Sequence, residues 1–372
     1  MSANPSIILF EDDQNELPGI VASLKKAFKE KANVIVFKAG TQNRVNKTFE
    51  TLLIGDLKPN LKSARFILCD QDLSKMEGYG GLSAETVTSV ARIEGLSIGL
   101  YGRGNSDIMA DRVKQKRQFL ERRFFLEFGS SSNLDAFCKE AVGIFDGCNQ
   151  VHGFVESTIF RNFRKNAKAK SGTPSSWMCE LLERPEIQTR LSLYGAGDQQ
   201  YLEGLATVDA LKEPERASRI ISSELSYWLW ESILRFPGIL LNQVAAASFL
   251  NIDELSFAKK EIQSLFKKAL YKGPFSSVSS RWWQDDLQAL LNHHGVKSGL
   301  EFAKSKGFAH ASRCKCSVDP KEDAGYYCML SEKPVSFKNS MGKIPYFPPG
   351  ADLARIANPE FAKVAPWAGL ES

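Results

Sequence analysis

The sequence contains no apolar run long enough to cross a membrane. A membrane-spanning helix needs about 18 or more consecutive, predominantly apolar residues, and every apolar stretch of this 372-residue chain is much shorter. The N-terminus also lacks the basic region, apolar core and small-residue cleavage site of a secretory signal. We therefore expect a cytoplasmic protein with no membrane partner.

Cysteine and histidine are scarce, with seven and four residues respectively. An odd number of cysteines without a secretory signal argues against a disulfide framework, so reduced thiols are expected. The net charge of +5 is small. A charge of this size permits contact with nucleic acid without indicating it. The chain also shows no internal repeat and no low-complexity tract.

The remaining composition is that of an ordinary globular protein. Hydrophobic residues make up 43% of the chain and charged residues 24%, and both values are typical of soluble domains. A chain of 372 residues can form two domains of common size.

The first part of the chain alternates between strand and helix patterns. Short apolar runs predict strands, and apolar residues at helical spacing predict the helices between them. Five strands alternating with helices predict an α/β domain with a five-stranded, doubly wound parallel sheet of the flavodoxin-like kind, over residues 1–149. The predicted strands lie at 6–10, 34–37, 64–73, 96–101 and 123–128, and the helices at 15–31, 48–57, 84–94, 107–122 and 134–145.

Acidic residues stand where two of these strands end. Glu11 and Asp12 follow the first strand, and Asp70 and Asp72 follow the apolar run of the third. Ligands of open α/β sheets lie outside the carboxyl ends of the strands. Two parallel strands that both stop at carboxylates therefore predict an acidic pocket at this edge of the sheet.

This layout, together with the two acidic clusters, resembles the receiver domain of bacterial two-component response regulators. The resemblance implies that Glu11, Asp12 and Asp70 hold Mg²⁺, that Asp70 is the phosphoacceptor of a phosphorelay, and that Asp72 offers its backbone carbonyl to the metal. The chemistry is coherent, because Mg²⁺ prefers oxygen ligands and a metal-shielded carboxylate can attack a phosphoryl group. A kinase is the partner that such a domain implies.

Two positions depart from the receiver pattern. Gly102 stands where the family has a phosphate-binding Thr or Ser, and residues 125–129 contain no Lys where the family has one. Without the hydroxyl and the ammonium, an acyl phosphate lacks two stabilising partners; Arg103 could replace them in part. We predict a divergent receiver or pseudo-receiver, and both phosphotransfer and Mg²⁺ binding without phosphorylation stay open.

A different class of protein also matches these carboxylates. The Toprim fold of Mg²⁺-dependent nucleases and topoisomerases has a Glu after one strand and an Asp-x-Asp after a later one, which Glu11, Asp70 and Asp72 satisfy. Clustered carboxylates suit two-metal phosphodiester cleavage. Glu11 lacks the glycine that usually follows in that family, so a Toprim-like nuclease is the alternative hypothesis.

The second half of the chain has mainly helical patterns. We predict a basic helical linker over residues 150–174 and a mainly α-helical interaction domain over 175–372, whose proline-rich end after Ser331 forms an extended strap. Nothing after residue 150 offers a nucleophile–base pair or a phosphate-binding glycine loop. The expected role of this half is to bind another protein, such as a co-encoded effector.

Residues 241–266 could form a helix-turn-helix, with residues 251–253 as the turn. The second helix would carry Glu254 and Glu261 beside four lysines at 259, 260, 267 and 268. Mixed charge of this kind is typical of a solvated helix surface, so nucleic-acid binding is possible here but not favoured.

A late group of His310, Cys314, Cys316 and Cys328 suggests either Zn²⁺ or buried thiols. Three thiolates and one imidazole suit tetrahedral Zn²⁺. Only one residue separates Cys314 from Cys316, however, whereas zinc modules usually have two to four. The spacing therefore favours plain buried thiols.

Taken together, these patterns predict a bacterial regulatory protein in which a divergent receiver is coupled to a helical protein-interaction domain. Receivers joined to unfamiliar domains occur in bacterial stress and phage-defence loci, and that analogy places this chain in such a system.

Overall fold

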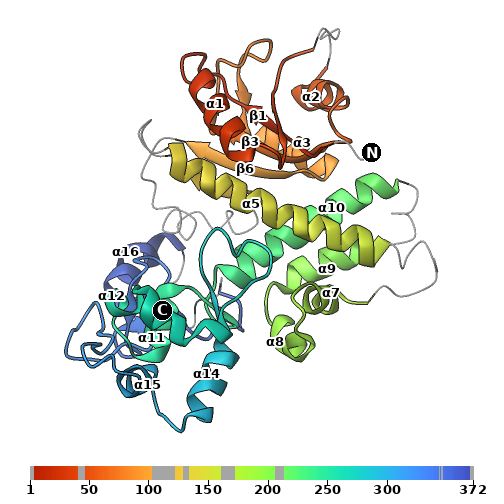
Figure 1. Ribbon diagram of the computed structural model, residues 1–372. Helices are drawn as coiled ribbons and strands as arrows, with labels where there is room; N and C mark the ends of the chain where they lie inside the picture. Colours follow the sequence, from red (N-terminus) through yellow and green to blue (C-terminus); the bar gives the residue numbers. More distant parts are fainter. Residues whose placement is uncertain are drawn as a thin grey trace. The chain divides into compact units, whose positions relative to one another are not determined.

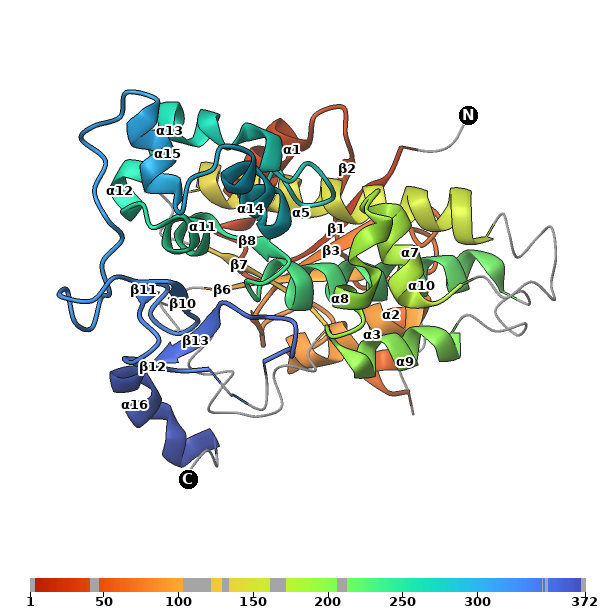
Figure 2. The ribbon, with the colours of Figure 1, turned by 90° about the horizontal axis from the view of Figure 1, so that it is seen from below.

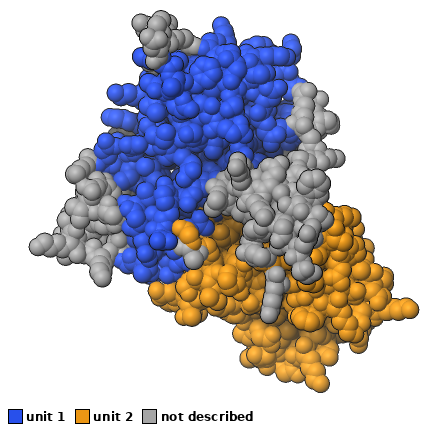
Figure 3. Space-filling view, turned by 180° about the vertical axis from the view of Figure 1, so that it is seen from behind, with its two compact units in different colours: residues 1–105, 122–177, 198–227 blue, residues 106–121, 178–197, 228–372 orange. Residues whose placement is uncertain are grey.

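Figure 1 shows a computed structural model of the chain, which describes residues 4–40, 47–102, 122–128, 134–160, 172–205, 213–342, 344 and 347–368. The chain divides into two compact units, coloured separately in Figure 3. Unit 1 comprises residues 1–105, 122–177 and 198–227, and unit 2 comprises residues 106–121, 178–197 and 228–372. Unlike the ranges expected from sequence, unit 1 includes residues 198–227.

Unit 1 is built around a five-stranded sheet in which all strands are parallel. The strand order is β2-β1-β3-β6-β7, the order of doubly wound flavodoxin-like sheets. This confirms the predicted α/β architecture. The strands are β1 (Ser6–Phe10), β2 (Asn33–Val36), β3 (Ala64–Asp70), β6 (Ser97–Gly102) and β7 (Phe124–Glu127).

The helices of unit 1 pack in pairs, α1 against α5 and α2 against α3 (Figures 1 and 2). Helix α3 begins and ends as the sequence predicts: the Ser83 side chain accepts a hydrogen bond from the Thr86 N–H, and Gly95 ends the helix with a φ of 70°. The helices are α1 (Leu17–Phe28), α2 (Phe49–Leu57), α3 (Ala84–Glu94) and α5 (Leu134–Phe154). The predicted helix at 107–122 lies almost wholly outside the described residues.

The core of unit 1 explains the continuous apolar runs of its central strands. All five residues of β1 are buried, and Phe10 stacks on Phe37 with ring centroids 4.2 Å apart. Strands covered by helices on both faces have no side that faces water, so they carry no alternation of apolar and polar residues.

A short hairpin not predicted from the sequence follows Asp70 directly. It pairs β4 (Asp72–Leu73) with β5 (Leu82–Ser83). Its tip is held by Tyr79, which is fully buried and donates a hydrogen bond of 2.8 Å to Asp56 Oδ2. The hairpin therefore has a fixed place beside the carboxyl end of β3.

Helix α10 (Pro214–Tyr227) explains why residues 198–227 belong to unit 1. It packs against α5 and α3. The Tyr227 hydroxyl accepts a hydrogen bond of 2.8 Å from the Ile98 N–H, at a point of β6 that precedes its pairing with β7. The helix thus satisfies a buried backbone group that the sheet leaves open. The other elements of this part are the π-helix η3 (Val155–Phe160), α7 (Pro174–Leu181) and α9 (Ala196–Leu205).

Unit 2 combines helices with small sheets, whereas the sequence predicted a mainly α-helical domain. A four-stranded sheet has the order β11-β10-β13-β12, and a two-stranded sheet pairs β8 with β9. The strands are β8 (Leu240–Leu241), β9 (Trp282–Trp283), β10 (Tyr326–Cys328), β11 (Pro334–Val335), β12 (Ser340–Met341) and β13 (Ala354–Ala357). These strands are two to four residues long, too short for a period of two to stand out.

The helices of unit 2 are also shorter than the sequence suggested. Residues 254–269 form three short helical pieces, and residues 354–368 form β13 and a helix in place of the predicted extended strap. Pro359 lies in the first turn of that helix, where a missing N–H costs no hydrogen bond. The elements are η4 (Pro185–Ile187), α8 (Gln188–Leu191), η6 (Trp228–Leu234), α11 (Gln243–Leu250), α12 (Glu254–Phe257), α13 (Lys260–Leu265), η7 (Lys267–Ala269), α14 (Gln284–His293), α15 (Gly299–Ser305) and α16 (Asn358–Ala368).

Across the part of the chain that the structure describes, no helix combines the length and the apolar character needed to span a membrane.

Candidate functional site

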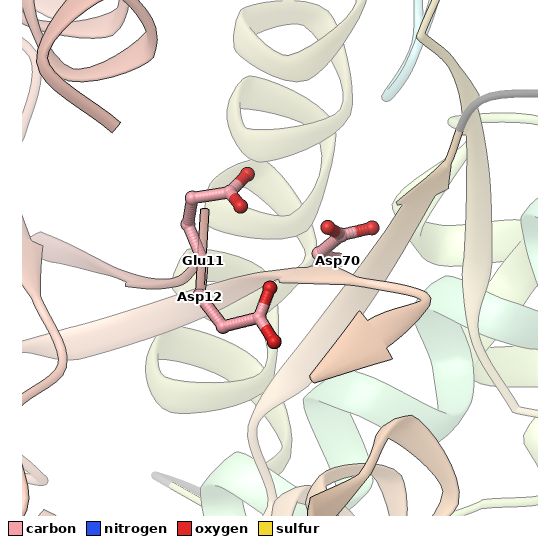
Figure 4. A group of neighbouring side chains, drawn as sticks. All are labelled: Glu11, Asp12 and Asp70. Atoms are coloured by element: carbon pink, nitrogen blue, oxygen red, sulfur yellow. The ribbon is translucent and has the colours of Figure 1, made fainter. Parts of the chain in front are cut away.

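Three carboxylates meet at the carboxyl edge of the sheet in unit 1 (Figure 4). Glu11 and Asp12 follow β1, and Asp70 is the last residue of the neighbouring β3. One ligand atom of each lies within 4.8 Å of the others. Within the described ranges, no other group of three or more His, Cys, Asp or Glu residues comes this close. The parallel strands therefore bring together Glu11, Asp12 and Asp70 as predicted.

Glu11 is held in place from two sides. Its side chain is buried, with Oε1 accepting a hydrogen bond of 2.9 Å from the Asp13 N–H and Oε2 accepting one of 2.9 Å from the Tyr101 hydroxyl. Burial raises the pKa of the Glu11 carboxyl above its usual value, although both hydrogen bonds act in the opposite direction. Glu11 is therefore the ordered, deeply placed member of the group.

Tyr101 is a residue of this site that sequence reasoning missed. It lies on β6, is 1% exposed, and packs its ring against Phe128 and Phe137 with centroids 5.3 and 5.1 Å away. Burial and the nearby Glu11 charge raise the pKa of the hydroxyl, so it stays a proton donor at neutral pH. Its position just before Gly102, at the end of a predicted strand, was the available clue.

Asp70 is the carboxyl most altered by its surroundings. Burial, followed by the charge of Glu11, raises its pKa to about 7. Hydrogen bonds from the Asp72 and Gln71 backbones act in the opposite direction without cancelling the rise. The group is thus poised between its protonated and ionised forms near neutral pH, and a bound cation would favour the ionised form.

Asp12 and Asp72 have different environments. Asp12 Oδ2 accepts a hydrogen bond of 2.7 Å from the Lys75 N–H in the β4–β5 hairpin. The Asp72 side chain is exposed and lies outside the three-carboxylate group, since its Oδ1 accepts a hydrogen bond of 3.0 Å from the Ser74 N–H. That bond lowers the pKa of Asp72. Of the four acidic residues predicted for the site, three carboxylates therefore converge.

The position that departs from the receiver pattern is occupied by a neighbouring side chain. Gly102 ends β6, and a Cβ atom added there would lie 2.5 Å from Gln71 Oε1. A Thr or Ser at this position would therefore require Gln71 to move. Arg103 lies outside the described residues, so its predicted compensating role has no structural account.

The three carboxylates form a donor set that fits Mg²⁺. Mg²⁺ prefers oxygen ligands, is commonly bound through one or two carboxylates, and keeps several waters. Glu11, Asp12 and Asp70 supply oxygen atoms at one edge of the sheet. A cation there would offset both the burial and the Glu11 charge that raise the pKa of Asp70. When bound, the ion would supply the charge that lets a carboxylate approach a phosphoryl group.

The residues of the predicted zinc site do not come together. His310 is exposed, whereas Cys314, Cys316 and Cys328 are buried. The Cys328 sulfur accepts hydrogen bonds from the Ser331 and Ala357 N–H groups, at 3.4 and 3.2 Å. Burial raises the pKa of the Cys314 thiol to about 11. The Cys314 environment suits a protonated, packed thiol. Within the described ranges, the three cysteines and His310 do not form the close ligand group that tetrahedral Zn²⁺ needs.

No family model, no curated protein and no solved structure matches the chain.

Proposed function

We propose that unit 1 is a receiver-like regulatory module whose carboxylates bind Mg²⁺ and which signals to a partner protein. The convergence of Glu11, Asp12 and Asp70 within 4.8 Å carries this proposal. The sheet order supports it, because it places the end of β1 and the end of β3 side by side. The partner and a role in bacterial stress or phage defence rest on the receiver resemblance alone.

The surroundings of Asp70 favour cation binding without phosphorylation. Gln71 occupies the space beside Gly102 where the family's phosphate-binding hydroxyl would stand, and the sequence after β7 has no Lys. An acyl phosphate on Asp70 would therefore lack both stabilising groups. Phosphotransfer at Asp70 is consequently not part of the proposal.

The Toprim-like nuclease is less well supported by the same geometry. That alternative needs the carboxylates of Glu11, Asp70 and Asp72 around the metals, yet the Asp72 carboxylate accepts its hydrogen bond from Ser74 and lies outside the group. The third carboxylate of the group belongs to Asp12, which the nuclease hypothesis does not use.

The test is a titration of the full-length protein with Mg²⁺, followed by calorimetry, and with Mn²⁺, followed by electron paramagnetic resonance. We expect binding by the wild type and a loss of at least about tenfold in affinity for D70N, because each carboxylate is both a ligand and a charge. D72N is the matched control and should bind like the wild type.

Other outcomes separate the hypotheses. Equal affinity of D70N and wild type would refute the proposed site. An Asp70-dependent adduct with acetyl phosphate or beryllofluoride would add phosphotransfer to the proposal. Mg²⁺-dependent nicking of plasmid DNA, lost in both D70N and D72N, would replace it with the nuclease.

A further inference from the structure

Helices α11 and α12 of unit 2 are joined by a short turn, at the place where the sequence suggested a helix-turn-helix. Asn242 caps the start of α11, and its side chain accepts a hydrogen bond of 2.8 Å from the Ala245 N–H. Asn251, with a φ of 54°, caps the end of the helix after Leu250. Asp253 then caps α12 by accepting a hydrogen bond of 3.0 Å from the Ser256 N–H. Three residues thus join α11 to α12, which is the connection length of a helix-turn-helix.

The turn and the inner faces of these helices are fixed by packing. Ala246, Ala247 and Leu250 of α11 are fully buried together with Ile252 of the turn and Phe257 of α12. Small side chains on α11 let the second helix approach closely. The turn is also tied to a distant segment, since the Asp253 N–H donates a hydrogen bond of 2.9 Å to the Ser312 carbonyl.

Short strands and a loop adjoin the helix-turn-helix. Strand β8 precedes α11 and pairs antiparallel with β9, and Leu270 forms an antiparallel bridge with Trp282 on the other side of β9. Residues 272–280 form the loop between Leu270 and β9. The segment from Leu240 to Trp283 therefore contains two helices joined by a short turn and a loop between paired strands. We term it the helix-turn-helix segment.

The lysines of this segment are exposed to solvent. Residues 254–272 contain five lysines, at positions 259, 260, 267, 268 and 272, against two glutamates, and all five lysines are exposed. Among the described residues, none of these lysines forms an ion pair of 4.0 Å or less, whereas Arg313 and Lys315 both pair with Asp323. Leu255 on α12 is 81% exposed.

We propose that the helix-turn-helix segment binds duplex DNA, with Lys259 and Lys260 contacting phosphates. In a helix-turn-helix the residues at the start of the second helix contact base edges in the major groove, and exposed lysines nearby supply charge that neutralises phosphates. The exposed Leu255 and Ala258 lie on or next to α12, where they offer apolar contact to base edges such as the thymine methyl. This inference is independent of the Mg²⁺ site in unit 1.

The test uses the full-length protein and fluorescence anisotropy with a labelled 30-base-pair duplex of random sequence. We expect salt-dependent binding by the wild type. Reversing two phosphate contacts in K259E/K260E should weaken the affinity at least about tenfold and make the salt slope shallower by about two. The control is K25E/K26E, which reverses two adjacent exposed lysines on α1.

The outcomes are distinct. Circular dichroism must show that both double variants keep the wild-type melting temperature; if K259E/K260E does not, K259Q/K260Q replaces it. The proposal is overturned if the wild type does not bind the duplex at low salt, or if both double variants lose the same affinity. Preference for an unlabelled single-stranded competitor over the duplex would also overturn it.

Discussion

Like charges gather at two places in this molecule, and their surroundings give them different consequences. At the carboxyl end of β3, burial and neighbouring charge raise the pKa of Asp70 to about 7. On the helix-turn-helix segment, five lysines stand exposed in water. Charge confined in a buried site favours a small counterion at contact distance, whereas charge spread over a surface favours a large, highly charged partner.

The supports of the two regions differ as well. Glu11 is positioned by hydrogen bonds from Asp13 and Tyr101, so polar contacts hold the acidic group itself. The lysines make no such contacts among the described residues, and their place depends on the apolar core beneath them. Phe257 and Trp282 are central to that core, with ring centroids 5.0 Å apart. Removing a support should therefore affect the two regions in different ways.

The largest effect is expected from Trp282→Ala. The side chain is 1% exposed, and truncation of a buried Trp costs about 3–5 kcal/mol in the free energy of unfolding. Urea unfolding followed by circular dichroism measures the change. Trp282→Phe should cost less, because the buried indole N–H has no hydrogen-bond partner within the described structure.

The matched comparison is Leu255→Ala, at the most exposed large apolar side chain of the same segment. Its stability should stay within about 0.5 kcal/mol of the wild type, as is usual for surface substitutions. If Trp282→Ala were equally mild, the apolar core would not be what positions the lysines.

A smaller effect is expected from Tyr101→Phe, which removes the hydroxyl that donates to Glu11. Loss of a partner from a buried polar group costs about 1–3 kcal/mol. Tyr271→Phe is the control, since it removes a hydrogen bond of 2.9 Å from a buried tyrosine hydroxyl to the Pro274 carbonyl, away from the acidic group. Thermal melts in EDTA and in Mg²⁺ distinguish the two: only Tyr101→Phe should alter the stabilisation by Mg²⁺, and a change of the same size in both would contradict this.

The smallest effect is expected from Asp70→Asn, which should raise the free energy of unfolding at high pH, whereas the preceding variants lower it. The pKa of Asp70 is about 7 in the folded protein and roughly 3.9 in an unfolded chain. Between these values the folded state holds a proton that the unfolded state has lost, so the free energy of unfolding falls as pH rises from about 4 to about 7. Asn does not titrate, so the variant does not show this fall in stability with rising pH. The free energy of unfolding of the variant, compared with that of the wild type, should therefore be about 1–2 kcal/mol higher at pH 8 than at pH 5, after allowance for solvent screening.

Urea unfolding in EDTA at the two pH values measures this difference. Asp72→Asn serves as the control, because its exposed carboxylate lies outside the three-carboxylate group. If the pH dependence of stability were the same in Asp70→Asn and the wild type, Asp70 would be an ordinary surface carboxylate. The acidic group would then not differ from the exposed lysines in being confined by burial.

Much of unit 1 could be predicted from the sequence because its determinants are local. The apolar runs of β1 and β3 and the Ser83 and Gly95 caps of α3 each act within a few residues, so the pattern shows them directly. Parallel pairing then places Glu11, Asp12 and Asp70 at one edge of the sheet. The role of Tyr101 could not be predicted in this way, because it depends on a contact between β6 and the end of β1 that is 90 residues apart in the chain.

Less of unit 2 could be predicted from the sequence, because its determinants are not local. The sequence predicted a turn at 251–253, and the capped helices on either side of it agree. It could not predict that α12 is only four residues long, or that two-residue strands pair across 40 intervening residues to form a loop beside it. Strands this short have no periodic pattern, and their pairing gains free energy only when the surrounding core buries Trp282 and Phe257.

By itself, therefore, the sequence determined the parallel sheet of unit 1 and the edge at which its carboxylates gather, because strand and cap patterns are local. The tertiary structure decided which side chains complete each region: Tyr101 beside Glu11, Gln71 beside Gly102, and exposed lysines over an apolar core. These contacts join segments far apart in the chain, and only the folded protein brings their atoms within reach of each other.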